Sequence, residues 1–405
     1  MTGSNVKEKD GHFGAGWSQS EIDACVFFKR EGKGFAILCC HVDDSFLVAS
    51  PDEDGQRIRN EFNEAFCKRF DLSEECTQGD QHEYLSMLIT IDRKKGSLTF
   101  KMPKLYKKLK AVLESMGDRA RRRGRYCTRE KLVKGEPQVV ESKNTDLKVR
   151  TPMALDHKDI FEPASIEEGN PIVPYDVFDS RKLLGLAAFI ILHIRPDAAH
   201  TAAVVARFTG CKQTEHVIKH VVRLCWYLVD SEHEAVLTYN RGVGDPQISC
   251  MVDASFANDP ITKKPYFGYV VMLGQNAIAW RSKLETCVAL STRDSELMAA
   301  VHAVRHVLGM RFFLHELGLL STGASKVMID NRASMDGVNN DKNTRHSHYM
   351  GYKISWLREQ VADLLVHFEH VKSKSNTADI FTKIIPEEQF KGLRAALLGL
   401  LADLG

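Results

Sequence analysis

The sequence predicts a chain of mixed class, with an α+β region first, a helical region next and an α/β region last. Three observations lead to this prediction. Strand-like apolar runs and helix-spaced apolar residues mix over the first 116 residues, helical spacing resumes between 179 and 230, and strand and helix patterns alternate beyond Gly242. With 405 residues, 43% of them hydrophobic and 27% charged, the chain can form two or three domains with separate cores.

The N-terminal region has the pattern of a sheet with helices. Apolar runs at 35–40 and 46–49 flank Asp43 and Asp44, which places this acidic pair at the tip of a hairpin. Taken alone, such a pair is more often a plain turn, because Asp is a favoured turn residue. The other elements expected here are strands at 24–29, 84–92 and 97–101, a helix containing Phe62, Ala65, Phe66 and Phe70, and a helix at 103–116.

Residues 117–150 lose the hydrophobic periodicity and indicate an exposed insertion. The insertion holds a dense basic cluster, which consists of Arg119, Arg121, Arg122, Arg123 and Arg125. Such a run is more often a solvated loop, and it gains a binding role only beside domains that handle nucleic acid, where it would neutralise phosphates. Helices are expected at 179–193 and 197–230, and Pro196 suits the first turn of the second.

Beyond Gly242 the pattern runs strand, strand, strand, helix, strand, helix, strand, helix. This order predicts an α/β domain over residues 241–405. The expected strands lie near 247–255, 266–273, 276–281, 325–330 and 364–371, and the expected helices near 293–317, 350–363 and 386–401.

Composition narrows the setting of the protein. No run of 18 apolar residues is present and the polar start lacks the apolar core of a signal peptide, so we expect an intracellular protein without a membrane partner. Ten scattered cysteines without a Cys-x-x-Cys pair favour buried thiols over disulfides or zinc. A net charge of +2 is too small to indicate nucleic-acid binding by itself.

Asp253 ends an alternating strand in which Ile248, Cys250 and Val252 share one face. Asp is disfavoured within strands, so a specific role must explain Asp253 at this position. A bound metal ion is one candidate, and a local turn at the strand end is the other.

The helix that begins near Ser291 carries two acids, Asp294 and Glu296, which diverge because they are two residues apart. Asp294 fits a capping box with Ser291, so Glu296 is the free candidate, on the face expected to pack against the sheet. A carboxylate buried there needs a counter-charge.

Asp330 follows an apolar strand, and Asp379 lies in the first turn of a later helix. Each has an ordinary alternative, helix capping for Asp330 and complementing the helix dipole for Asp379. The four acids together, Asp253, Glu296, Asp330 and Asp379, follow the order strand, helix, strand end, helix, which is a specific pattern.

Clustered carboxylates suit two Mg²⁺ or Mn²⁺ ions about 4 Å apart, which activate water and stabilise the leaving oxygen of a phosphodiester. The pattern therefore predicts hydrolysis of the RNA strand of an RNA–DNA hybrid. His346 and His348, in a polar loop, could shuttle a proton, although exposed loop histidines are usually only solvated.

The chain resembles the C-terminal part of copia-type retrotransposon polyproteins, reverse transcriptase followed by ribonuclease H. The resemblance covers nearly the whole chain outside the insertion. The motifs that carry it are His41-Val-Asp-Asp44, Arg181-Lys-Leu-Leu-Gly185, Ile194-Arg-Pro-Asp197, Val252-Asp-Ala-Ser-Phe-Ala257, Gly268-Tyr-Val270, Ala279-Trp-Arg-Ser-Lys283, Val288-Ala-Leu-Ser-Thr292, Asp330-Asn331 and Ala378-Asp-Ile-Phe-Thr-Lys383.

The resemblance implies a partial polymerase palm at 1–116, a helical thumb or connection at 151–240, and a ribonuclease H-like domain with a five-stranded mixed sheet at 241–405. It implies that Asp43 and Asp44 are the polymerase's metal-binding pair and that the four acids are the ribonuclease tetrad. The helical part would grip the nucleic-acid backbone through Arg207, Lys212, Lys219 and Arg223.

Two departures from the family pattern bear on polymerase activity. His41 stands where the family usually has an aromatic residue, and the strand with the third polymerase aspartate would precede residue 1. We therefore expect no DNA synthesis by this chain alone.

The expected partners are an RNA–DNA hybrid, template-primer and the rest of a retroelement polyprotein, in a cytoplasmic virus-like particle or the nucleus. One rival is an inactive remnant or domesticated protein that binds nucleic acid without cutting. Another is a strand transferase of the integrase type, which leaves the polymerase motifs unexplained.

Overall fold

The computed structural model describes residues 16–42, 44–70, 79–120, 129–133, 136–140, 148–210, 213–242, 247–319, 323–339 and 350–400. The chain divides into two compact units. The first unit comprises residues 1–98 and 309–321, and the second comprises 99–308 and 322–405.

The first unit contains an antiparallel sheet in the order β1-β2-β3-β4, covered by α1 (Glu53–Phe70). Strands β3 and β4 pair up to His41 and Asp44, which confirms the predicted hairpin. The strands of this sheet are β1 (Ser18–Gln19), β2 (Val26–Glu31), β3 (Gly34–His41) and β4 (Asp44–Ala49). Their core with α1 consists of Trp17, Ala36, Leu38, Ile58 and Phe62.

The single strand predicted at 84–92 is instead the hairpin of β5 (Gln81–Tyr84) and β6 (Met87–Asp92). The cause lies in Leu85 and Ser86, whose φ angles of 50° and 64° turn the chain back on itself. Strand β7 (Ser97–Lys101) and helix α2 (Pro103–Ser115) follow as predicted.

The insertion is more ordered than predicted, because it contains the antiparallel hairpin of β8 (Arg129–Val133) and β9 (Glu136–Val140). Helix α3 (Ser180–Ile194) agrees with the sequence. The single helix predicted at 197–230 is wrong: it is two helices, α4 (Ala199–Ala206) and α5 (Glu215–Asp230). The helix restarts because the Thr214 side chain caps α5 by accepting a hydrogen bond from the Val217 amide.

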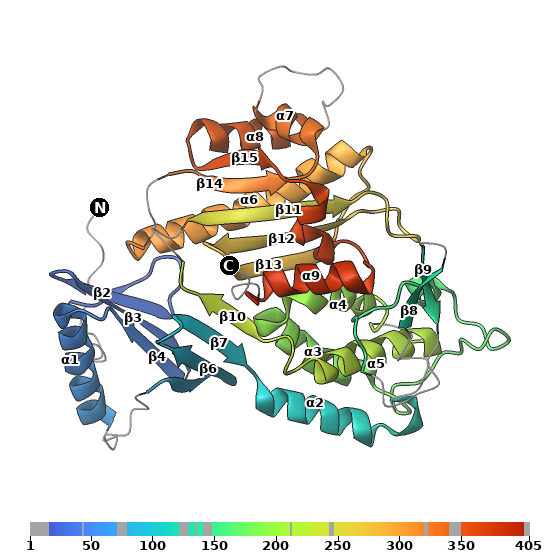
Figure 1. Cartoon of the computed structure of the whole chain (residues 1–405), viewed down its shortest axis with the longest axis horizontal. Helices are drawn as coiled ribbons and strands as arrows, with labels where there is room; N and C mark the ends of the chain where they lie inside the picture. The colour runs from blue at the N-terminus through green and yellow to red at the C-terminus, as the bar shows by residue number, and fades with distance from the viewer. Residues whose placement is uncertain are drawn as a thin grey trace. The chain divides into compact units, whose positions relative to one another are not determined.

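A five-stranded mixed sheet forms the centre of the second unit, as predicted (Figure 1). Its order is β13-β12-β11-β14-β15, antiparallel from β13 to β11 and parallel from β11 to β15. The strands are β11 (Ile248–Ser255), β12 (Tyr266–Leu273), β13 (Asn276–Leu284), β14 (Ser325–Ile329) and β15 (Val366–His370). The short strand β10 (Leu237–Asn240) precedes them in the chain.

Helix α6 (Thr292–Glu316) packs against this sheet, where His302 stacks on Phe267 and His306 bonds the Tyr269 hydroxyl. Of the described helices, α6 alone is long and apolar enough by composition to cross a membrane, a test that a core helix also passes. Helices α8 (Gly351–Ala362) and α9 (Glu387–Leu397) agree with the sequence. Helix α7 (Arg332–Asn339) was not among the expected elements.

The thiols only partly follow the prediction of burial. Cys225 and Cys250 are buried, whereas Cys39, Cys40 and Cys287 are half-buried. Cys39 and Cys40 are neighbours near the end of β3, where the strand is only half-buried, so an apolar neighbourhood in the sequence did not guarantee burial.

Candidate metal centre

Two of the predicted acids meet because of the register between two parallel strands. Met251 of β11 pairs with Met328 of β14, and Asp253 and Asp330 each lie two residues further along. Since the carboxyl ends of parallel strands meet at the same edge of a sheet, both carboxylates reach one place. Asp253 is buried within β11, and Asp330 is half-buried just after β14.

The third acid is brought to this edge by the short 3-10 helix η7 (Thr377–Phe381). Asn376, fully buried, donates from Nδ2 to the Val252 carbonyl at 2.9 Å and accepts from the Ala378 amide at 3.1 Å. Gly268, which pairs with Asp253 across β11 and β12, leaves the space that Phe381 fills. These contacts fix η7 on the sheet and with it Asp379.

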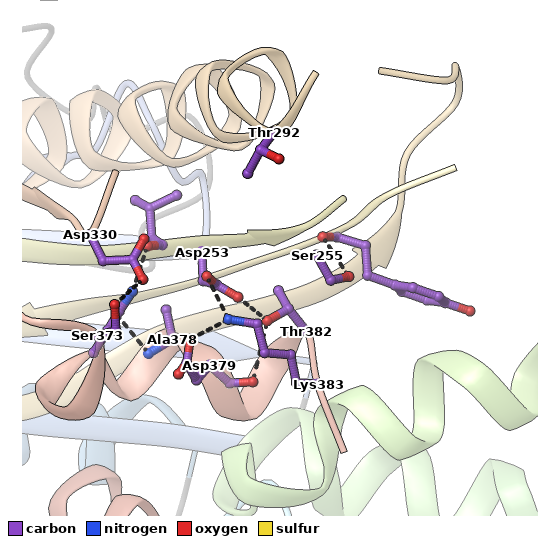
Figure 2. Close-up of polar contacts among 12 residues, drawn as sticks. Asp253, Ser255, Thr292, Asp330, Ser373, Ala378, Asp379, Thr382 and Lys383 are labelled. Carbon is purple, nitrogen blue, oxygen red and sulfur yellow. Dashed lines mark hydrogen bonds and ion pairs between the residues drawn. The ribbon is translucent and has the colours of Figure 1, made fainter. Parts of the chain in front are cut away.

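Asp253, Asp330 and Asp379 each offer an oxygen, and the three oxygens lie within 4.8 Å of one another. Figure 2 shows the three side chains converging from a strand, a strand end and η7. This is the one group of three or more potential metal ligands among the described residues. The geometry therefore unites residues 253, 330 and 379, which are far apart in the sequence.

Glu296 extends from α6 to the same cleft but is outside the 4.8 Å group. Its helix face is buried as expected, together with Ala300, Ala303 and Val307. Burial, together with Asp253 and Asp330, raises the pKa of Glu296 well above its usual range. The positive charge of Lys383 acts in the opposite direction, but the Oε2 atom of Glu296 is buried without a hydrogen-bond partner.

Ser291 caps α6, as predicted, because its hydroxyl accepts a hydrogen bond from the Asp294 amide at 3.1 Å. Asp294 is thereby held at the helix start, two residues from Glu296. The division of roles between the two acids follows the sequence argument.

Two residues of this centre were given no role from the sequence, Thr382 and Lys383. The Thr382 hydroxyl donates to Asp253 Oδ2, and the Lys383 ammonium lies 3.2 Å from Asp253 Oδ1 and 2.8 Å from Asp379 Oδ1 (Figure 2). The spacing of four residues between Asp379 and Lys383 was the available signal, since side chains four apart meet on a helical turn.

Neighbouring charges shift the pKa values of Asp379 and Lys383. Burial and the negative charge of Asp253 raise the pKa of Asp379 to about 6, although Lys383 acts in the opposite direction. Burial alone would lower the pKa of Lys383, but Asp253 and Asp379 raise it well above its usual range. Lys383 therefore carries a full positive charge at neutral pH.

The centre opens into a cleft of about 500 Å³. The described residues that line it are Asp253, Ala254, Ser255, Phe256, Asn258, Thr292, Glu296, Asp330, Asn331 and Lys383. At its border the Ser373 hydroxyl donates to Asp330 Oδ2 at 2.9 Å, which orients this carboxylate.

The donor set fits hard divalent cations. All candidate ligands are carboxylate oxygens, which Mg²⁺ and Mn²⁺ prefer. The orphaned Oε2 of Glu296 is a buried acceptor that a cation would satisfy. Asp253, Asp330, Asp379 and Glu296 are thus the residues able to hold metal ions here.

The predicted polymerase pair is described only at Asp44, an exposed residue that opens β4 and accepts a hydrogen bond from the Leu85 amide at 3.3 Å. Among the described residues, Asp44 belongs to no group of acids close enough to share an ion. The other predicted site residues that lie outside the described part of the chain are Asp43, Arg121, Arg122, Arg123, Lys212, His346 and His348.

The three described residues that were predicted to grip nucleic acid have partners within the protein. Arg207 pairs with Asp259, and Lys219 lies 2.9 Å from Asp159. Arg223 is buried and donates to the Thr151 hydroxyl at 2.9 Å, so it stabilises the packing of α5 and is not presented to a bound strand. This corrects the expectation for Arg223, whereas binding through Arg207 and Lys219 stays a prediction.

The chain is similar to retrotransposon polyproteins, which confirms the resemblance found in the sequence. The Retrovirus-related Pol polyprotein from transposon TNT 1-94 of Nicotiana tabacum is 28% identical over 376 residues, 91% of this chain. The Transposon Ty1-BR Gag-Pol polyprotein of Saccharomyces cerevisiae is 22% identical over 394 residues, 93% of this chain. The chain spans 25% and 19% of these relatives. No protein-family model matches it.

Solved structures with similarity to the chain include two nucleic-acid complexes. One is LC11-RNase H1 in complex with RNA/DNA hybrid, 13% identical, with a TM-score of 0.27, covering 34% of this chain and 94% of that one. The other is the foamy viral protease-reverse transcriptase dRH in complex with dsDNA, 14% identical, with a TM-score of 0.31. The match covers 55% of this chain and 35% of that one. The fold of the second unit is defined by the strand order β13-β12-β11-β14-β15 and not by these similarities.

Proposed function

We propose that residues 241–405 hydrolyse the RNA strand of an RNA–DNA hybrid with two divalent ions, as a ribonuclease H of a retroelement polyprotein. The observation that carries the proposal is the convergence of Asp253, Asp330 and Asp379 within 4.8 Å, beside the buried Glu296. Four acids in one open cleft are costly unless cations balance them.

The residues have distinct tasks in this proposal. Asp253, Asp330 and Asp379, whose oxygens lie within 4.8 Å of one another, would hold the ions together with Glu296. Thr382 and Lys383 contact the two oxygens of Asp253 and orient this carboxylate. When bound, the ions supply an activated water and charge stabilisation at the leaving oxygen. The protein holds the carboxylates rigidly through Asn376 and Ser373.

Similarity to Pol polyproteins over most of the chain supports a retroelement origin. In such a setting the substrate is the hybrid that reverse transcription leaves behind. A strand transferase would use the same kind of acids, and the choice of substrate separates the two activities.

The test is cleavage of a hybrid labelled in its RNA strand by the full chain, with Mg²⁺ or Mn²⁺. We expect cleavage of the hybrid and none of duplex DNA. Asp253→Asn should cleave the hybrid more than about 100-fold more slowly than the unaltered chain. Mutation of residues that only orient the metal ligands already lowers metal affinity or activity about 10- to 100-fold. The matched control is Asp336→Asn on the exposed face of α7, which should stay fully active.

Binding of hybrid without cleavage by the unaltered chain would favour the rival hypothesis of an inactive nucleic-acid-binding protein. Equal cleavage by the unaltered chain and Asp253→Asn would place the reaction elsewhere. Cleavage of the RNA strand that Asp253→Asn abolishes supports the proposal.

A further inference from the structure

Lys383 is the one Lys or Arg among the described residues that line the cleft. Its ammonium lies between Oδ1 of Asp253 and Oδ1 of Asp379, at 3.2 Å and 2.8 Å. Figure 2 shows the nitrogen between the two carboxylates, on the side chain that follows η7. A positive charge therefore already stands within the proposed metal centre.

The position of this ammonium is incompatible with a divalent ion held by the same two oxygens. Carboxylate ligands bind Mg²⁺ at about 2.0–2.1 Å, so such an ion would lie between the oxygens that Lys383 bridges. The two cations would also repel each other at short range in a partly buried site. Lys383 and an ion at this position must exclude each other.

Asp253 and Asp379 need a counter-charge when no ion is bound. Asp253 is 1% exposed and Asp379 is 6% exposed, and two adjacent buried carboxylates repel. The Thr382 hydroxyl contacts the second oxygen of Asp253, and Asn376 fixes the turn, so the carboxylates cannot separate easily. The Lys383 charge stabilises this arrangement.

The side chain of Lys383 has room to leave. It is 40% exposed and lines the cleft, and its ammonium is carried on four methylene groups. The Lys stem is flexible, so the ammonium can turn toward solvent while the backbone of η7 stays in place. Once outside, it would lie at the cleft border, where a phosphodiester would pass.

We propose that Lys383 is an internal counter-ion, which occupies the cation position between Asp253 and Asp379 and is displaced when a divalent ion binds. The inference rests on the proposed function for the identity of the ion. It makes Lys383 a positioning residue that keeps the centre assembled without metal and weakens the binding of the first ion.

The test compares the full chain with Lys383→Met after treatment with EDTA. Mn²⁺ binding is followed by electron paramagnetic resonance, and stability by thermal unfolding without metal. We expect Lys383→Met to bind Mn²⁺ roughly tenfold more tightly, since a competing ion pair is removed. It should also unfold at a lower temperature in EDTA, and Mn²⁺ should abolish this difference.

Lys391→Met is the matched control, because Lys391 also pairs with an acid four residues away, Glu387, and is 38% exposed. It should leave Mn²⁺ affinity unchanged. Lys383→Gln keeps a hydrogen-bond donor without the charge, and should also bind Mn²⁺ more tightly, which guards against a folding defect in the Met variant.

Unchanged or weaker Mn²⁺ binding by the folded Lys383 variants would overturn the inference. Hybrid cleavage is measured separately on the unaltered chain. A chain that binds Mn²⁺ without cleaving hybrid would refute the proposed function, whereas the difference in Mn²⁺ affinity would still decide the role of Lys383.

Discussion

A single methyl group on β12 should disable the centre without touching a carboxylate. Gly268 lies under η7, and a Cβ atom there would lie 3.0 Å from Thr382 Cγ2, 3.1 Å from the Phe381 carbonyl carbon and nearer still to Phe381 Cβ. Ordinary carbon contacts are about 3.5–4.0 Å, so Gly268→Ala requires η7 to move by roughly 1 Å.

This displacement reaches the chemistry directly, because η7 carries Asp379 two residues before Phe381. Catalytic groups tolerate only about 0.5 Å, and a misplacement of 1 Å costs about 100-fold in rate. We expect kcat for hybrid cleavage to fall about 100-fold. Overpacking should lower the free energy of unfolding by about 1–3 kcal/mol, which leaves the domain folded.

The assay is steady-state cleavage of labelled hybrid together with urea denaturation. The control is Gly392→Ala on α9, where a Cβ would meet no heavy atom within 4 Å. It should keep full activity and gain about 0.5–1 kcal/mol, as Gly to Ala does within helices. A Gly268→Ala protein with normal kcat would refute the claim that η7 positions Asp379.

Two further predictions concern stability. Burial lowers the pKa of His200 to about 3. Below about pH 6.5, His200 therefore binds a proton in the unfolded chain but stays neutral in the folded chain. The free energy of unfolding should therefore fall by about 1.4 kcal/mol per pH unit between roughly pH 6 and pH 4. In urea denaturation at several pH values, the free energy of unfolding of His200→Asn should depend on pH less steeply, by the equivalent of one proton. An unchanged pH dependence would show that His200 is not the group responsible. Asn376→Ala removes the hydrogen bond from Asn376 Nδ2 to the Val252 carbonyl, and it should lower the free energy of unfolding, measured by urea denaturation, by about 1–3 kcal/mol. A cost below about 0.5 kcal/mol would show that this bond does not hold η7.

The hydrophobic pattern predicted most elements of the second unit, because β11 alternates between buried and half-buried residues at its start and β12 is an apolar run whose first six residues are buried. It failed where local backbone conformation decides the outcome. Leu85 and Ser86 adopt positive φ angles without the Gly or Asn that usually marks such a turn. The break between α4 and α5 lies in a stretch whose apolar residues keep helical spacing.

The acids of the candidate centre were predicted from the sequence because the four together follow the order strand, helix, strand end, helix, although each of them alone has an ordinary explanation. Their convergence depends on strand order and register, which no local pattern contains. The contacts of Lys383 and Thr382 with Asp253 were not predicted for the same reason. Lys383, for example, is 130 residues from Asp253 in the sequence. The buried state of Arg223 likewise depends on tertiary packing.

In the proposed function, Asp253, Asp330, Asp379 and Glu296 together hold divalent ions. The most direct measurement is the anomalous scattering of Mn²⁺ in crystals of the full chain. We predict two peaks about 4 Å apart, both within ligand distance of Asp253, and neither in Asp253→Asn. Crystals of the folded protein in millimolar Mn²⁺ that show no peak among these carboxylates would show that the four acids do not form a metal centre.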